Sequence, residues 1–153
     1  ACLVGSEMCI RDSLFSGSGA IGIEALSRGA KQAYLVEFGK EPLRCIKANL
    51  AKTHLEDQAV VLPVEVTYAV SKLEKQGTTF DIIYADPPYR SGFEEKLAQL
   101  IGQSDIVKED TLVIFESALE TPIDFIDEDI YEIEKVKEYK TNKHIFLRVK
   151  KER

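Results

Sequence analysis

The sequence predicts an α/β domain with a mostly parallel sheet that ends in an antiparallel pair of strands. Between residues 14 and 115, short apolar segments alternate with amphipathic helical segments, which is typical of a parallel sheet joined by helical crossovers. Residues 130–136 and 144–149 then alternate between apolar and polar side chains, which predicts the antiparallel pair. A glycine-rich turn at residues 17–22 separates the first apolar segment from the first helical one.

The first half of the chain is expected to alternate between strands and helices. The expected strands are residues 14–15, 32–36 and 59–64. The expected helices are residues 20–28, 41–52 and 68–75. Gly29 and Gly77 follow two of these helices and can end them, because glycine adopts a left-handed backbone without strain. Pro42 fits the first turn of the second helix.

The second half is expected to contain one helix and the remaining strands. The strands are residues 80–85, 111–115, 130–136 and 144–149. The helix is predicted at residues 93–101. Four apolar side chains of this helix are expected to face the core: Phe93, Leu97, Leu100 and Ile101. Cys45, in an earlier helix, is also expected to be buried.

Length and composition indicate a single soluble domain of 153 residues. We expect no metal, because the three cysteines have no metal-site spacing and there are only two histidines. We expect no membrane span, because no apolar run is long enough, and a reducing cytoplasm, because the cysteines form no disulfide framework. A monomer is expected. The net charge of −6 argues against a strongly basic nucleic-acid-binding face. Basic residues near the C-terminus fit either a solvated edge or an RNA-binding face; they are Lys135, Lys137, Lys140, Lys143, Arg148, Lys150, Lys151 and Arg153.

The first thirteen residues differ from the rest of the chain. They show neither strand alternation nor a helical stripe, and they lack the basic and apolar regions of a signal peptide. The string resembles a translated sequencing adapter, and a genuine short strand at residues 8–10 is the alternative. We therefore predict a non-native segment at residues 1–13 and a single domain at residues 14–153.

The glycine-rich turn matches the pattern G-x-G-x-x-G, in which glycines let the backbone approach a ligand closely. Glu37 lies twenty residues after Gly17, at the end of the next predicted strand, where a carboxylate can accept hydrogen bonds from ribose. This fits the adenosine of NAD or of S-adenosylmethionine, and the alternative is a connection without a ligand. Glu65 ends the third predicted strand, where it either accepts the adenine amino group or lies in a solvated loop.

An Asp-Pro-Pro-Tyr turn, Asp86 to Tyr89, follows the fourth predicted strand. Pro87 and Pro88 fix the backbone and remove two donors. A base amino group that donates to the Asp86 carboxylate and the Pro87 carbonyl becomes more pyramidal, so its lone pair can attack a sulfonium methyl group. Tyr89 can stack on an extruded base. An ordinary turn is the alternative, but this position is where an α/β sheet forms its substrate crevice.

Four stretches together resemble the bacterial RsmD-like family of 16S rRNA guanine-N2 methyltransferases. The stretches are Leu14 to Ala30, Leu35 to Glu37, Phe80 to Tyr89 and Lys137 to Thr141. The resemblance spans residues 14–150 and implies a class I S-adenosylmethionine-dependent methyltransferase fold, which is Rossmann-like. It also implies methyl transfer from S-adenosyl-L-methionine to a guanine of the position-966 type, in 16S rRNA or in an assembling small ribosomal subunit.

The resemblance also implies roles by position. Cofactor binding falls to Phe15, Gly17, Ser18, Gly19, Glu37 and Glu65. Within this set, Gly17 and Gly19 line the methionine part, Glu37 binds the ribose and Glu65 lies at the adenine. Binding of the target base and catalysis fall to Asp86, Pro87, Pro88 and Tyr89.

Three departures from the family pattern bear on activity. Ser13 and Glu65 stand where the family usually has Asp, and the family's basic N-terminal extension is absent. Because that extension helps to bind RNA and completes the cofactor pocket in the family, this chain is expected to be weakly active or inactive. Restoring the extension is expected to recover cofactor binding.

Other functions remain open from the sequence. A DNA adenine-N6 or cytosine-N4 methyltransferase would use the same turn chemistry, although the chain has no target-recognition domain. An NAD-binding oxidoreductase domain would account for the glycines and Glu37 but would leave Asp86 to Tyr89 without a role. A non-catalytic assembly or binding module is a further alternative.

Overall fold

A computed structural model gives the structure of the chain and describes residues 12–16, 22–23, 26–27, 29–86 and 93–151. Seven strands in these ranges form one sheet: β1 (Asp12–Ser16), β2 (Gln32–Val36), β3 (Ala59–Leu62), β4 (Ile82–Ala85), β5 (Leu112–Ala118), β6 (Tyr131–Glu138) and β7 (Asn142–Val149). Their order is β3-β2-β1-β4-β5-β7-β6. Strands β1 to β5 are parallel, whereas β7 is antiparallel to both β5 and β6. The predicted mostly parallel sheet with an antiparallel end is confirmed.

The helices connect the parallel strands as predicted. They are α2 (Lys40–Thr53), α3 (Val66–Lys75) and α4 (Phe93–Gln103), with a short 3-10 turn η1 (Glu56–Gln58) before β3. Residues 22–23 and 26–27 are helical and fall within the helix predicted at residues 20–28, whose other residues lie outside the described ranges. Gly29 follows them with φ of 110°, and its N–H donates to the carbonyl of Leu26. Glycine suits this position because it tolerates a positive φ.

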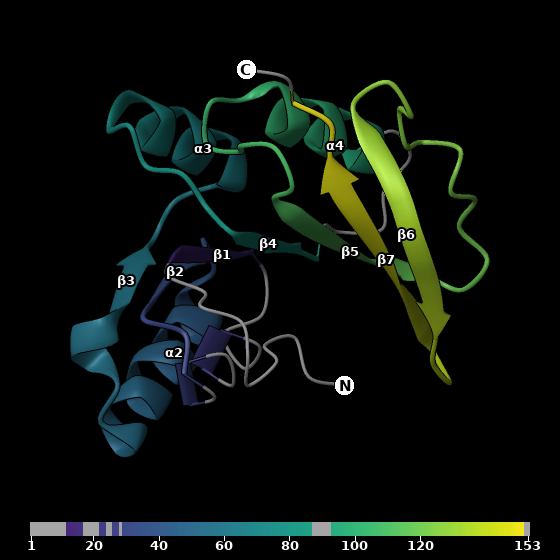
Figure 1. Cartoon of the computed structure of the whole chain (residues 1–153). Coiled ribbons are helices and arrows are strands. Elements are labelled where there is room, and N and C mark those ends of the chain that lie inside the picture. Colours follow the sequence, from purple (N-terminus) through teal and green to yellow (C-terminus); the bar gives the residue numbers. More distant parts are fainter. Residues whose placement is uncertain (1–11, 17–21, 24–25, 28, 87–92, 152–153) are drawn as a thin grey trace.

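Helices cover the two faces of the sheet through two apolar clusters. On the face that we call the α2 face, Ile46 and Leu50 of α2 pack with Leu26 and with side chains of the parallel strands. On the opposite face, α3 and α4 contribute Leu73 and Leu97 to the second cluster. Figure 1 shows α3 and α4 on one side of the sheet and α2 on the other.

Burial along the strands follows this arrangement. Strand β4 is buried at every position, because a central parallel strand is covered on both faces. Strand β7 alternates: Lys143, Ile145, Leu147 and Val149 are buried, whereas its intervening side chains on the α2 face are only half-buried. The α2 face of the sheet is therefore less completely covered at β7 than at β4.

Three predictions about single residues are wrong. Leu100 is exposed, because the buried side of α4 runs through Leu97, Ala98 and Ile101. Cys45 is also exposed. Successive side chains on a helix point about 100° apart, so the burial of Ile46 leaves the preceding Cys45 on the solvent side. Glu65 does not end a strand, as described below.

Among the described residues, each helix is too short or too polar to cross a bilayer. Within the same ranges, no group of three or more His, Cys, Asp or Glu side chains is arranged to hold a metal ion.

Candidate active site

The parallel register brings the carboxyl ends of five strands to one edge of the sheet. Ser16 pairs with both Val36 and Ala85, so the residues that follow β1, β2 and β4 start side by side. Val36 also pairs with Leu62, and Ala85 with Phe115. The chain order reverses between β1 and β4, and such a switch point is where an α/β sheet opens a crevice for ligands.

The structure describes only some of the residues that the sequence selects for this edge. Gly17, Ser18, Gly19, Pro87, Pro88 and Tyr89 lie outside the described residues. Phe15 lies in β1, one position before its end. Glu37 directly follows β2 and Asp86 directly follows β4. The two carboxylates thus follow the two strands that flank β1.

The Glu37 side chain is fixed by its own loop. Its Oε2 accepts hydrogen bonds from the backbone N–H groups of Phe38 and Gly39, each at 3.0 Å. Gly39 is the residue that caps the N-terminus of α2, where the helix dipole favours a negative charge. Because Oε2 already accepts hydrogen bonds from two amides, Oε1 is the oxygen through which Glu37 can accept hydrogen bonds from hydroxyl groups of a ligand.

Glu65 lies further from the sheet than the sequence predicts. Strand β3 ends at Leu62, because Pro63 has no N–H to donate to a neighbouring strand. Glu65 instead occupies the N-cap position of α3 without a side-chain capping hydrogen bond, and its exposed carboxylate accepts a hydrogen bond from Thr67 Oγ1 at 2.7 Å. Its predicted position at a strand end is therefore wrong.

Asp86 is half-buried at the end of β4. Burial and, to a lesser extent, the negative charge of Glu116 together raise the pKa of its carboxyl group from 3.8 to about 6. A carboxyl group with a pKa near neutrality can both accept and release a proton under physiological conditions. This is the chemical property that distinguishes Asp86 from an ordinary surface aspartate.

A polar cluster that the sequence analysis did not select adjoins Asp86. The Tyr84 hydroxyl donates a hydrogen bond to Glu116 Oε1. His144 Nε2 lies 3.4 Å from the same oxygen and 3.4 Å from the Tyr84 oxygen. Tyr139 stacks obliquely on His144, with ring centroids 4.8 Å apart, and its buried hydroxyl has no hydrogen-bond partner in the part of the chain described. The cluster holds Glu116 beside Asp86.

One member of this cluster carried a usable sequence signal. Glu116 follows the strand predicted at residues 111–115, just as Glu37 and Asp86 follow theirs. No sequence pattern indicated His144, because its position opposite Glu116 depends on the register between β5 and β7.

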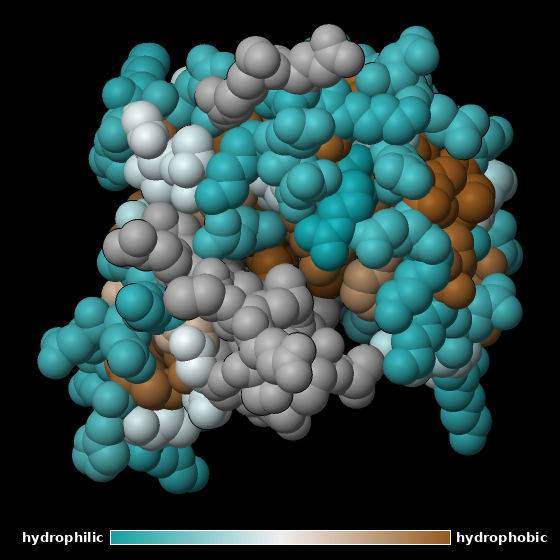
Figure 2. Space-filling view, viewed as in Figure 1, coloured by the Kyte–Doolittle hydropathy of each residue, from teal (hydrophilic) through white to brown (hydrophobic). Residues whose placement is uncertain are grey.

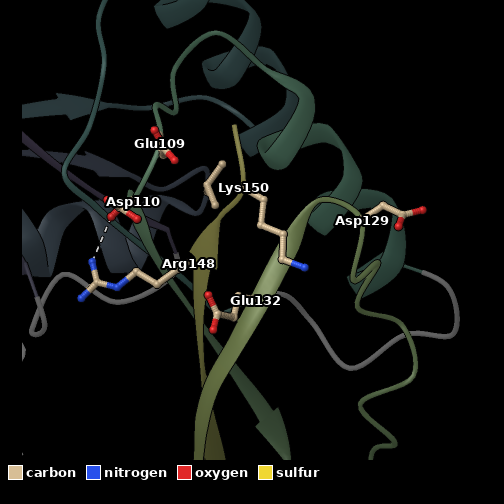
Figure 3. Close-up of a pocket in the computed structure, with 7 residues that line it drawn as sticks. Glu109, Asp110, Asp129, Glu132, Arg148 and Lys150 are labelled. Carbon is tan, nitrogen blue, oxygen red and sulfur yellow. Dashed lines mark hydrogen bonds between the residues drawn. The ribbon is translucent and has the colours of Figure 1, made fainter. Parts of the chain in front are cut away.

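A pocket of about 600 Å³ lies beside the start of β5 and the end of β7, away from the carboxyl ends of the parallel strands (Figure 3). Its lining residues are Glu109, Asp110, Asp129, Glu132, Arg148, Val149 and Lys150. Its cations are already bound within the chain: Arg148 Nη1 donates to the Asp110 carbonyl at 2.9 Å, and Lys150 Nζ donates to the Glu128 carbonyl at 2.7 Å. These contacts connect the loops to β7, and the pocket lies apart from Asp86.

Comparison with known proteins gives matches along most of the chain. A family model described as Conserved hypothetical protein 95 matches residues 6–150, starting inside the segment predicted to be non-native. Ribosomal RNA small subunit methyltransferase D of Escherichia coli K12 is 35% identical over 106 residues, which are 69% of this chain and 52% of that protein. Ribosomal RNA large subunit methyltransferase I of Vibrio vulnificus is 31% identical over 105 residues, 67% of this chain and 26% of that protein. The chain thus spans about half the length of the small-subunit relative.

Solved structures share the fold. A conserved hypothetical protein of Streptococcus pyogenes superposes with a TM-score of 0.80 at 26% identity, over 92% of this chain and 86% of that chain. An RNA methyltransferase of Salinibacter ruber, described in complex with S-adenosyl-L-homocysteine, superposes with a TM-score of 0.69 at 12% identity, over 93% and 82% of the two chains. The predicted class I methyltransferase fold is confirmed. Since the family match covers residues 6–150, the chain belongs to the Conserved hypothetical protein 95 family, the RsmD-like methyltransferase family that its motifs resemble.

Proposed function

We propose that this chain is the catalytic core of an S-adenosylmethionine-dependent methyltransferase that acts on ribosomal RNA. The observation that carries the proposal is the position of Asp86. Its carboxyl group, with a pKa raised to about 6, directly follows β4 at the edge where β1 and β2 also end. Relatives named as ribosomal RNA methyltransferases support RNA as the substrate.

Glu37 suits the ribose of the cofactor. Its carboxylate is an acceptor group held in place by two backbone amides, and a ribose diol offers two donors. When bound, S-adenosylmethionine supplies a methyl group on a positively charged sulfur. The remaining cofactor assignments rest on the sequence pattern and the resemblance; they are Phe15, Gly17, Ser18, Gly19 and Glu65.

Asp86 is assigned to the target amino group. Methyl transfer forms a bond between the amino nitrogen and the methyl carbon while the carbon–sulfur bond breaks, and the methylated nitrogen then loses one proton. The Asp86 carboxylate accepts a hydrogen bond from the amino group, which orients the nitrogen, and its raised pKa suits it to take that proton. From the sequence, the Pro87 carbonyl is the second acceptor, Pro88 fixes the turn, and Tyr89 stacks on the base.

The exocyclic N2 group of a guanine in 16S rRNA, of the position-966 type, is our proposed target. The small-subunit relative is more similar than the large-subunit relative, and the match covers 52% of its length against 26%. The partner is therefore proposed to be 16S rRNA or an assembling small subunit. An NAD-dependent oxidoreductase is less well supported, because it gives no role to Asp86.

Calorimetry and a transfer assay test the proposal together. S-adenosylmethionine and NAD are titrated separately into the chain, and transfer of a radiolabelled methyl group to 16S rRNA and to small-subunit particles is measured. Because the chain spans about half the length of its small-subunit relative, both measurements are repeated on a chain that carries a family-type N-terminal extension. We expect binding of S-adenosylmethionine but not of NAD, and transfer to guanine N2 that the extension strengthens.

Two variants separate chemistry from folding in this assay. Asp86→Asn is expected to lower transfer by about 10²-fold or more, because it removes the proton acceptor, while cofactor binding persists. Asp110→Asn is the matched control in the pocket beside the start of β5, and its transfer should equal that of the parent. Binding of NAD alone, or full transfer by Asp86→Asn, would contradict the proposal.

A further inference from the structure

Six of the basic residues near the C-terminus fall into two groups in the structure. One group is bound within the chain: Lys143 donates to the carbonyls of Leu119 and Thr121, Arg148 to Glu134 and Asp110, Lys150 to Glu128, and Lys151 to Ser104 and Val107. These four side chains hold loops and strands together. They are less suited to bind an external anion, because each is already engaged by acceptors within the chain.

The second group points to solvent from one face of β6. Lys135 and Lys137 are both exposed and lie two residues apart in the strand, so they share a face. Lys135 Nζ lies 4.7 Å from the centroid of the Phe146 ring, and Lys137 Nζ lies 5.5 Å from the centroid of Tyr139. The ammonium groups are thereby held over the α2 face of the β6–β7 ribbon.

This face leads directly to the candidate active site. Lys137 pairs with His144 across β6 and β7, and His144 pairs with Glu116 across β7 and β5. Glu116 follows Phe115, the partner of Ala85, so it lies level with Asp86. Three strand spacings of about 4.8 Å put the Lys137 backbone about 15 Å from Asp86. Lys137, the His144–Glu116 pair and Asp86 form one row across the sheet, and Lys135 lies beside this row, opposite Phe146.

The same face is not covered by the described helices. Residues 144, 146 and 148 of β7 are half-buried there, while their neighbours on the opposite face are buried. Figure 1 shows the end of the β6–β7 ribbon projecting beyond the helices, and Figure 2 shows hydrophilic residues over this end. Glu134, which precedes Lys135 in β6, is paired with Arg148, and Glu138, which follows Lys137, alternates to the opposite face of the strand.

We infer that the α2 face of the β6–β7 ribbon, with Lys135 and Lys137, binds the phosphate backbone of the RNA strand whose base enters the site at Asp86. The inference rests on the proposed function. Ammonium groups neutralise phosphates whatever the sequence, so this surface positions the strand and leaves recognition of the base to the active site. A ribbon in line with Asp86 can hold the nucleotides that flank the target.

The test uses the double variant Lys135→Gln with Lys137→Gln. Binding of a short fluorescein-labelled single-stranded RNA is followed by anisotropy over a range of salt concentrations. Each phosphate contact contributes about 0.7 to the slope of log K against log salt, so the slope should fall by about 1.4 and affinity by about 25-fold near ~0.1 M salt. Methyl transfer to 16S rRNA should show a raised KM and a nearly unchanged kcat.

One matched control makes the same charge change at another place, and a second keeps both positive charges in β6. Lys72→Gln with Lys75→Gln removes two exposed lysines from α3, on the opposite face of the sheet, and should leave the RNA affinity unchanged. Lys135→Arg with Lys137→Arg keeps both charges and should restore binding. Thermal unfolding of each variant checks that the fold persists, and surface substitutions of this kind change stability little.

The outcomes separate this inference from the proposed function. Loss of RNA affinity in the β6 variant alone supports the inference. Equal loss in the α3 variant, or no loss in the β6 variant while the parent still transfers methyl groups, overturns the inference and leaves the proposed function standing. If the chain with a family-type N-terminal extension binds S-adenosylmethionine but neither binds nor methylates RNA, both the inference and the RNA substrate are wrong.

Discussion

Asp86 is a carboxylic acid in surroundings that oppose its ionisation. Burial at the end of β4 is the larger cause and the nearby Glu116 carboxylate is the smaller one. Glu116 is itself fixed by the Tyr84 hydroxyl and stays within reach of His144, so it cannot easily turn away. The residue that is most useful for chemistry is therefore one that weakens the fold when it is charged.

Asp86→Asn is expected to stabilise the fold at neutral pH. The folded-state pKa of about 6 lies above the ordinary 3.8, so between these values the folded chain holds a proton that the unfolded chain has released. The contribution of Asp86 to stability therefore falls as pH rises through this window. We expect the variant to gain about 1–2 kcal/mol at pH ~7, after allowance for solvent screening, and much less at pH ~4.

Urea unfolding of parent and variant at both pH values measures this effect. Asp124→Asn removes a carboxyl group from an exposed loop position and serves as the control. A gain for Asp86→Asn that is the same at both pH values would show that the ionisation of Asp86 is not its cause.

At the scale of elements, helix α4 packs on β6 through a glycine. The Tyr131 hydroxyl donates to the Ala98 carbonyl at 2.6 Å, which brings the start of β6 against the helix. A Cβ atom on Gly102 would lie 2.3 Å from Ile130 Cγ2 and 2.8 Å from the Tyr131 hydroxyl. The close contact therefore depends on the absence of a side chain at this position.

Gly102→Ala is expected to destabilise the chain by about 1–3 kcal/mol, because overpacking outweighs the gain in helix propensity. Chemical denaturation gives the free energy of unfolding. The same substitution in an Ile130→Ala background should be less damaging, because the nearest atom has been removed. At an open helical position the change would stabilise by about 1 kcal/mol, so a stabilised Gly102→Ala would rule out the close contact.

Alternation of apolar segments predicted the sheet well, and the errors have local causes. The predicted range of β2 agrees with the structure at both ends. Strand β3 is shorter than predicted because its apolar run continues through Pro63, which cannot take part in the ladder. Leu100 was misplaced because helical spacing indicates an apolar side without fixing which flanking residue the neighbouring strands cover.

The site was predictable where it depends on the order of elements. Glu37 and Asp86 follow parallel strands directly, so their common edge comes from the fold itself. The pairing of His144 with Glu116 depends instead on the register of antiparallel strands. That register is not encoded in alternation alone, because a shift by two residues preserves the buried face.

At the scale of the whole molecule, a ligand that binds at the carboxyl edge would contact residues after several strands at once. It should therefore stabilise the entire sheet. S-adenosyl-L-homocysteine at about 100 times its Kd is expected to add about 2.7 kcal/mol, which raises Tm by about 5–11 °C for a chain of this size. Differential scanning calorimetry measures the shift. NAD at the same concentration should leave Tm unchanged, and an equal shift with NAD would contradict the cofactor assignment.

An irregularity in the pairing of β6 with β7 also affects whether the chain can associate with other copies of itself. Strand β6 forms one outer edge of the sheet, and its pairing is interrupted between Ile133 and Lys135, next to two lysines. The other edge is β3, a strand of four residues followed by Pro63. The addition of a foreign strand is hindered at β6 by irregular pairing and charge, and at β3 by short length and proline. Both margins of the sheet are therefore poor templates for aggregation, although the sheet is open at each end.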